Sequence, residues 1–309
     1  MTLLPRTGID APQLDSRGRS KSGRPAPARG DASTRRWAAT GDLADLPAWT
    51  DLRLDESIGH RVAIVPDAAT LDDHDFERRT TQAYEELLDG VAADRILRAW
   101  NFIPRINEDA GCEPAGPCDR YMRFNAGRYR GFQRRYDEVP GYPVASGVGH
   151  SGDDLVVHLL HGDAELRLID NPRQIRPESY SGRFGDPPPV FARAAMVKRP
   201  DDEWLLVSGT ASVVGEASLH DDSFEDQLNE TFRNLEVVVT AGWSDATPAE
   251  LQDWLVYLPD LERMGEVVDA VARRWPGRRP DLVFREQRLC RPELQVEIEC
   301  AGFRETASS

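Results

Sequence analysis

The segment CRPELQVEIE (residues 290–299) ends in an alternation of apolar and polar residues that places carboxylates where they could do chemistry. Successive side chains of a β-strand point to opposite faces, so one set would enter a core and the other would face solvent or a cleft. The apolar set is Leu294, Val296 and Ile298, and the polar set is Gln295, Glu297 and Glu299. A carboxylic acid partly desolvated in a cleft has a raised pKa and can donate a proton near neutral pH. Spacing alone favours an ordinary solvent-facing strand, so the surroundings of Glu297 decide its role.

The composition is that of a globular protein, with 40% hydrophobic and 29% charged residues in a chain of 309. This length is enough for two domains. The formal net charge of −15 is uneven: residues 1–36 carry about +5, which leaves about −20 for the remainder. Such an acidic body repels nucleic-acid phosphates and anionic lipid, so we expect neither as a partner. A small anionic substrate would need a local cluster of arginines.

The first 36 residues are rich in Arg, Pro, Gly and Ser and hold almost no large apolar residue. They cannot bury enough surface to offset the entropy of ordering, so we expect residues 1–36 to be a disordered tail. No stretch approaches the roughly 20 apolar residues of a membrane span, and no apolar signal core follows the first basic residues. This pattern predicts a cytoplasmic protein.

Metal and cofactor signatures are missing from the sequence. The cysteines are too few and too scattered for a disulfide framework or a zinc site, so we expect free thiols at Cys112, Cys118, Cys290 and Cys300. There is no Gly-rich phosphate loop, metal-ligand cluster or nucleophile elbow. The sequence therefore favours a reaction on a small molecule that needs no cofactor, in a monomer or weak oligomer.

One order of elements occurs twice along the chain: helix, strand, helix, strand, strand. The first set is predicted at 80–91, 98–107, 121–136, 144–150 and 154–162, and the second at 224–243, 254–260, 261–275, 282–289 and 294–302. A hairpin at 191–199 and 204–215 precedes the second set. The match in order and spacing indicates a duplicated α+β unit. We therefore expect an N-terminal domain at 37–165 and a C-terminal domain at 166–309.

The second unit resembles the RidA/YjgF fold, an α+β sheet packed against two helices. Denser motifs over roughly residues 60–303 resemble the chorismatase family. They are AWNFIPRIN, RYMRFNAGR, ASGVGHSGDDLVVHLL, DNPRQ, FARA, LLVSGTAS and CRPELQVEIE. The resemblance implies two RidA-like domains in one chain, mixed sheets packed on helices, and an active site in the second domain that faces the first.

The same resemblance implies an activity and the residues that carry it. Chorismatases release pyruvate from chorismate, a dicarboxylate with an enolpyruvyl ether, and the demanding step is protonation of the terminal methylene carbon. Glu297 matches the family's catalytic glutamate. Gly209 and Cys290 match positions that separate product classes, and Gly with Cys accompanies the branch that forms 3-hydroxybenzoate. Binding of the two carboxylates falls to Arg128, Arg120 and Arg193, with Asn125 and Tyr180 as further polar contacts.

Two departures from the family pattern leave alternatives open. A Tyr-Pro-rich segment is expected after NPRQ, where this chain has IRPESYSGRFGDPPP, and Glu216 stands where a histidine is expected. A small-residue run such as SGTAS (208–212) can also be a β-bulge rather than a ligand contact. The alternatives to a 3-hydroxybenzoate synthase are a chorismate hydrolase that forms a dihydroxycyclohexadiene carboxylate, a RidA-type imine deaminase, and a non-catalytic binding protein on the RidA fold.

Overall fold

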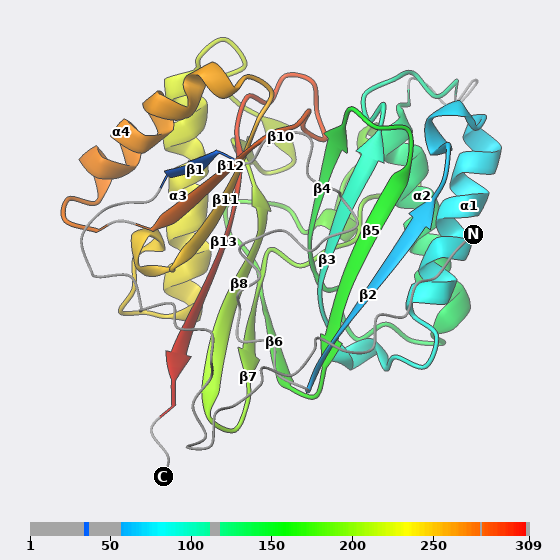
Figure 1. Ribbon diagram of the computed structural model, residues 1–309, viewed down its shortest axis with the longest axis horizontal. Coiled ribbons are helices and arrows are strands. Elements are labelled where there is room, and N and C mark those ends of the chain that lie inside the picture. Colours follow the sequence, from blue (N-terminus) through cyan, green and yellow to red (C-terminus); the bar gives the residue numbers. More distant parts are fainter. Residues whose placement is uncertain (1–33, 37–56, 112–117, 279, 307–309) are drawn as a thin grey trace, which may run out of the picture.

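A computed structural model describes residues 34–36, 57–111, 118–278 and 280–306. Within them the chain forms two mixed sheets, each covered by two helices (Figure 1). No described helix is long and apolar enough to cross a membrane. Three of the α-helices begin at side-chain caps, since Asp72, Asp119 and Ser223 each accept a hydrogen bond from a backbone N–H of the first turn.

The first sheet has the strand order β2-β5-β3-β4. Its strands are β2 (Ile58–Val65), β3 (Ile96–Pro104), β4 (Val144–His150) and β5 (Leu155–Gly162). The helices α1 (Asp73–Leu87) and α2 (Arg120–Arg135) precede β3 and β4 and pack on each other. Strand β3 is parallel to β4, and β5 is antiparallel to both β3 and β2.

The second sheet repeats this arrangement and extends it. Its core has the order β12-β11-β13-β8, with β8 (Asp202–Thr210), β11 (Asp253–Leu258), β12 (Asp281–Glu286) and β13 (Glu297–Glu305). Helices α3 (Phe224–Gly242) and α4 (Met264–Arg274) precede β11 and β12. Again one pair, β11 with β12, is parallel, while β13 is antiparallel to β11 and β8. The same strand order and directions in both sheets confirm the predicted repeat.

Additional strands border the second sheet. Strands β6 (Glu165–Ile169) and β7 (Ala194–Lys198) continue it beyond β8, and β1 (Thr34–Arg36) pairs in parallel with β12. A short ribbon joins β9 (Val213–Val214) to β10 (Ala217–Ser218). The predicted disordered tail is therefore wrong for residues 34–36, and its remainder lies outside the described residues. The predicted boundary at 165/166 falls at the first residue of β6, and the domain bounds stay a prediction.

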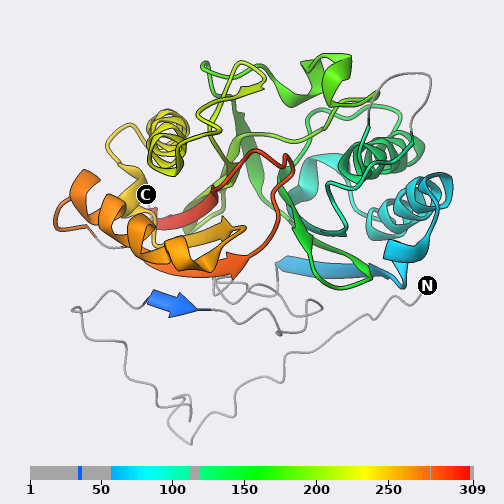
Figure 2. The ribbon, with the colours of Figure 1, turned by 90° about the horizontal axis from the view of Figure 1, so that it is seen from above.

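The two sheets face each other and the helices lie outside, which gives four layers (Figures 1 and 2). Side chains of both sheets fill the space between them, called the middle layer below; among them are Trp100, Phe102, Trp204 and Tyr257. Separate apolar clusters join each sheet to its own helices. Each sheet is thus buried on both faces, and any polar group between the sheets must find a partner there.

The start of β13 differs from the prediction in one respect. The strand begins at Glu297, and residues 290–296 form a loop that runs between the two halves (Figure 2). From there the alternation holds: Ile298 and Cys300 pack towards the helices, while Glu297 and Glu299 point into the middle layer. Both carboxyl groups are buried, so the solvent-facing interpretation of this strand is wrong.

Candidate active site

A cavity of about 210 Å³ opens where the two halves meet. Its walls come from the first turn of α2, the loop between β6 and β7, the end of β8, and the loop that leads into β13. A second lobe of about 40 Å³ lies beside it. Both lobes are lined by Tyr121, Phe191, Gly209, Cys290 and Glu297. Glu297 therefore stands at the junction, where it can reach a molecule in either lobe.

Glu297 has the properties of a proton donor. Its side chain is only 4% exposed. Burial raises the pKa of its carboxyl to about 8, and the negative charge of Glu299 acts in the same direction. The group is therefore mostly protonated at neutral pH and lies beside an apolar wall that includes Leu294 and Ala211.

Gly209 gives that carboxyl its space. A Cβ atom added at Gly209 would collide with Oε1 of Glu297 and would lie 3.1 Å from Oγ of Ser146. The register of β8 against β13 shifts between Ile298 and Cys300, so a bulge lies at Ser208 and Gly209. The predicted β-bulge is present, the side chain of Glu297 makes the close approach at Gly209, and a ligand contact there stays a prediction.

Cys290 is a neutral thiol at the junction of the two lobes. Burial raises its pKa to about 12, with Glu297 as a further cause. A thiol that stays protonated is a poor nucleophile. Cys290 can therefore act on a bound molecule through its size and apolar surface.

Arg193 and Tyr180 form one unit in the larger lobe. Nη2 of Arg193 donates to the Tyr180 hydroxyl at 2.7 Å and to the backbone oxygen of Ile175 at 3.0 Å. The Arg193 side chain is 9% exposed, and its Nε has no hydrogen-bond partner among the described residues. This guanidinium is held in place and keeps donor capacity for an anion in the cavity.

Arg128 lines the smaller lobe. Its side chain is 3% exposed, and Nε and Nη2 lack a hydrogen-bond partner within the described part of the chain. The guanidinium lies 5.7 Å from the ring centre of Tyr84 and 5.9 Å from that of Phe132. Asn125, one turn earlier on α2, is 1% exposed, and neither side-chain polar atom has a hydrogen-bond partner in the same part of the chain. Buried donors without partners are costly, which is typical of groups kept for a ligand.

Arg120 does not reach the cavity. Its guanidinium donates to the backbone oxygens of Ala68 and Leu71, and it stacks 4.1 Å from the ring centre of Phe76. The prediction that Arg120 binds substrate is wrong, because these contacts fasten α2 to the start of α1.

Cys118 also departs from the expectation. It is disulfide-bonded, whereas Cys290 and Cys300 are free thiols. Cys112 lies outside the described residues. The prediction of free thiols is therefore wrong for Cys118.

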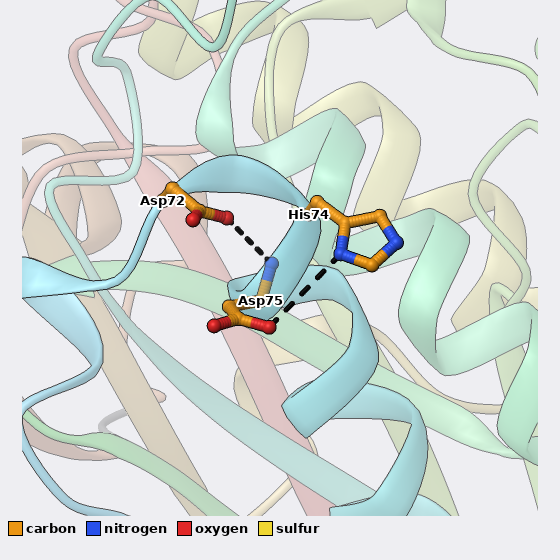
Figure 3. Close-up of side chains that lie close together, drawn as sticks. All are labelled: Asp72, His74 and Asp75. Carbon is orange, nitrogen blue, oxygen red and sulfur yellow. Dashed lines mark hydrogen bonds and ion pairs between the residues drawn. The ribbon is translucent and has the colours of Figure 1, made fainter.

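A surface group of possible metal ligands belongs to a helix cap. Asp72, His74 and Asp75 lie together at the start of α1 (Figure 3). Asp72 accepts a hydrogen bond from the backbone N–H of Asp75 at 2.8 Å, and Asp75 pairs with Arg78 at 2.9 Å. These contacts explain the cluster by capping and by a surface ion pair.

Comparison with known proteins supports the predicted resemblance. Residues 52–161 match the family described as "Chorismatase FkbO/Hyg5-like, N-terminal". A 3-hydroxybenzoate synthase of Streptomyces hygroscopicus is 32% identical over 225 residues, which are 69% of this chain and 65% of that protein. A chorismatase of Streptomyces rapamycinicus is 27% identical over 227 residues, which are 69% of this chain and 66% of that protein.

The chain is similar to chorismatases over 69% of its length. The matches span just under two thirds of the length of these two relatives. A crystal structure of a chorismatase superimposes with a TM-score of 0.66 at 20% identity, over 81% of this chain and 78% of that one. This superposition and the two helix-covered mixed sheets confirm the predicted α+β fold. A YjgF-family protein from Mycobacterium tuberculosis, Rv2704, aligns over its full length with 45% of this chain at 22% identity and a TM-score of 0.33.

The two departures from the chorismatase pattern contact each other in this chain. Glu216 accepts hydrogen bonds of 2.7 Å from both the backbone N–H and the hydroxyl of Ser181. Ser181 follows Tyr180 in the loop that walls the larger lobe. The glutamate therefore holds the altered loop, and the two changes form one structural adjustment.

The structure adds cavity residues that the sequence did not single out. Arg183 and Arg291 line the larger lobe, and the Arg291 guanidinium lies 4.0 Å from the ring centre of Phe184. Tyr121 lines both lobes, and burial raises the pKa of its hydroxyl. Helical spacing could have identified Tyr121, which lies seven residues before Arg128 and so on the same face of α2.

Proposed function

We propose that this chain is a chorismatase that converts chorismate to pyruvate and 3-hydroxybenzoate. The observation that carries the proposal is the buried, protonated carboxyl of Glu297 at the edge of a cavity that also holds several arginines. Chorismate has the matching parts, an electron-rich methylene carbon and two carboxylates. The named relatives support this substrate.

The proposed reaction begins with proton transfer from Glu297 to the methylene carbon of the enolpyruvyl group. Protonation turns the ether oxygen into a leaving group: the neighbouring ring hydroxyl attacks the ring carbon that bears it, the carbon–oxygen bond to the ring breaks, and pyruvate departs. The bridged ring then opens and loses its C–H proton, which gives 3-hydroxybenzoate, whereas water that attacked the cation instead would give pyruvate and the diene diol. Pyruvate and 3-hydroxybenzoate together contain all the atoms of chorismate, so the reaction needs no oxidant, reductant or cofactor. The glutamate recovers its proton as the ring loses one.

The arginines would orient the substrate by planar, paired hydrogen bonds to its carboxylates. Arg128 and Arg193 keep donor atoms without partners among the described residues. Tyr180 is fixed by Arg193, and Asn125 lies one turn from Arg128. Gly209 leaves room for the Glu297 carboxyl, and Cys290 presents a neutral surface to the ring.

Incubation of the purified protein with chorismate and chromatography of the products tests this function. The expected result is one 3-hydroxybenzoate per pyruvate. A dihydroxycyclohexadiene carboxylate in its place would make the chain a chorismate hydrolase. If chorismate is not consumed, the proposal is contradicted. The two alternatives left are then a RidA-type imine deaminase and a non-catalytic binding protein.

Cys290→Ala is expected to keep chorismate consumption while shifting product from 3-hydroxybenzoate toward the hydrolysed diene diol. The smaller side chain leaves space beside Glu297 in which water can compete for the cation. The product ratio from chromatography measures this effect. Cys300→Ala is the matched control, because Cys300 lies in the apolar cluster between the second sheet and its helices. An unchanged product ratio would mean that the Cys290 side chain only fills space and does not direct the ring chemistry.

Arg128→Lys is expected to lower kcat/KM for chorismate by about 10- to 100-fold, mainly through KM, because lysine keeps the charge but loses the planar fork. Steady-state kinetics measure it. Arg134→Lys is the control, since Arg134 lies on the same helix with 58% of its side chain exposed. Equal kinetics for the two variants would place the carboxylate contact elsewhere.

A further inference from the structure

A fully buried ion pair joins the two sheets beside the cavity. Nη2 of Arg98 on β3 lies 2.6 Å from Oε2 of Glu299 on β13, and both side chains are 0% exposed. Trp100 Nε1 donates to Oε1 of Glu299 at 2.8 Å, and the Ser146 hydroxyl donates to Oε2. Arg98 also donates to the backbone oxygen of Val207 at 3.1 Å. Three residues of the first sheet thus hold one carboxylate of the second.

This network continues to the proposed proton donor. The backbone N–H of Gly209 donates to Oγ of Ser146 at 2.9 Å. Gly209 is the residue against which the Glu297 carboxyl packs. Glu299 therefore fixes Ser146, Ser146 fixes the bulge at Gly209, and the bulge bounds the position of the Glu297 carboxyl.

The pair also places a charge next to the donor. Glu297 and Glu299 lie on the same face of β13, about 6–7 Å apart along the strand. The negative charge of Glu299 is one of the two causes that raise the pKa of Glu297. Burial raises the pKa of Tyr121, Tyr257 and Cys290, so these groups stay neutral in the range where Glu297 titrates. None of the other charged groups that line the cavity is among the causes that shift the pKa of Glu297; they are Asp119, Arg128, Arg183, Arg193, Arg291 and Glu293.

Stability is a weak explanation for such a pair. Two desolvated charges often contribute no more than apolar residues of similar volume, although loss of one partner is costly. The middle layer around this pair is otherwise built from large apolar side chains. A charged pair retained next to a catalytic carboxyl points to a role in the chemistry.

We propose that Arg98 and Glu299 are positioning residues that hold the Glu297 carboxyl in place and set a negative charge beside it. The inference rests on the proposed function, since it assigns Glu297 the role of acid. Arg98 pairs with Glu299 at 2.6 Å, so the second carboxyl group of the strand is partnered inside the fold while Glu297 faces the cavity. Neither positioning residue lines the cavity, and both act through Glu297.

The test is the pH profile of chorismate turnover in Glu299→Gln. In the parent, activity needs protonated Glu297, so kcat/KM should fall as pH rises through about 8. Removal of the Glu299 charge lowers the pKa of Glu297, so this alkaline limb should move to lower pH by up to about two units, as expected for a charge about 6–7 Å away at an effective dielectric constant near 20. Arg98→Gln/Glu299→Gln leaves no unpaired charge and serves if the single variant does not fold; its limb should move in the same direction but less, because the positive charge of Arg98 is removed as well.

Controls separate this role from a purely structural one. Trp100→Phe removes a donor to Glu299 but keeps its charge, and Asp202→Asn breaks a buried ion pair with Arg199 of 2.7 Å elsewhere in the sheet. Both should lower the melting temperature and leave the alkaline limb in place. A limb unmoved in the double variant, or moved equally in Asp202→Asn, would overturn the inference.

A direct titration distinguishes failure of the inference from failure of the proposed function. With glutamate labelled at the side-chain carboxyl by ¹³C, the Glu297 resonance is assigned by its loss in Glu297→Gln. Its titration should move to lower pH in the double variant whether or not chorismate is the substrate. An unshifted titration would refute the positioning role, while absence of turnover in the parent would refute only the proposed function.

Discussion

Glu297→Gln is expected to lower chorismate turnover by about 10²–10⁴-fold, the range typical of the loss of a general acid. Glutamine keeps the shape of the side chain and removes the acidic proton. KM should change little, because the arginines that would hold the carboxylates are untouched. Single-turnover measurements at pH 7 report the loss. Glu305→Gln, at the far end of the same strand, is the matched control.

The same variant has a stability signature with a definite sign. Glu297 has a pKa of about 8 in the folded chain and an ordinary pKa when unfolded, so between these values the folded state binds the extra proton. The parent therefore loses stability as pH rises through this window, whereas Glu297→Gln should not. Melting temperatures should be similar near pH 4 and higher for the variant at pH 8. Parental turnover in Glu297→Gln would show that the proton donor lies elsewhere.

The elements of this fold could be predicted because each unit is locally consistent. Helices α2 and α3 follow the predicted ranges within one residue, and both sheets keep one strand order. The error at Arg120 shows what the motif alone could not supply. Arg120 is rotated by about 80° from Arg128 around the helix axis, whereas Tyr121 lies on the same helix face as Arg128. Helical periodicity therefore identifies Tyr121 as a cavity residue, whereas residue-by-residue matching of the motif RYMRFNAGR does not.

Other parts of the site depend on contacts that no local pattern contains. Arg98 and Glu299 lie 201 residues apart and meet because two sheets pack face to face. An alternating strand gives the face on which Glu299 lies, but whether that face meets solvent or another sheet depends on the whole fold. Arg183 and Arg291 lie in loops that wall the cavity, and no local pattern places such loops; residues 294–296, predicted as the start of a strand, belong to one of them.

Gly209→Ala is expected to lower turnover by about 10- to 100-fold and to shift product toward the diene diol. The added methyl group occupies the position of the Glu297 carboxyl, which is bounded on its other sides by buried residues and must turn away. Displacement of a reacting group by about 1 Å can cost on the order of 10² in rate. Turnover and product ratio are measured together. Gly265→Ala on α4, where an added Cβ meets no atom within 4 Å, is the control.

A second substitution shows whether the loss arises from this collision. Glu297→Asp shortens the acid by one methylene group and should itself be impaired, because the proton is held too far from the methylene carbon of chorismate. In Gly209→Ala/Glu297→Asp the shorter side chain leaves space for the new methyl group, so the two losses should be clearly less than additive. Strict additivity, or parental turnover in Gly209→Ala, would mean that Gly209 does not set the position of the acid. Compensation would tie the missing side chain at Gly209 to the placement of the proton that begins the reaction.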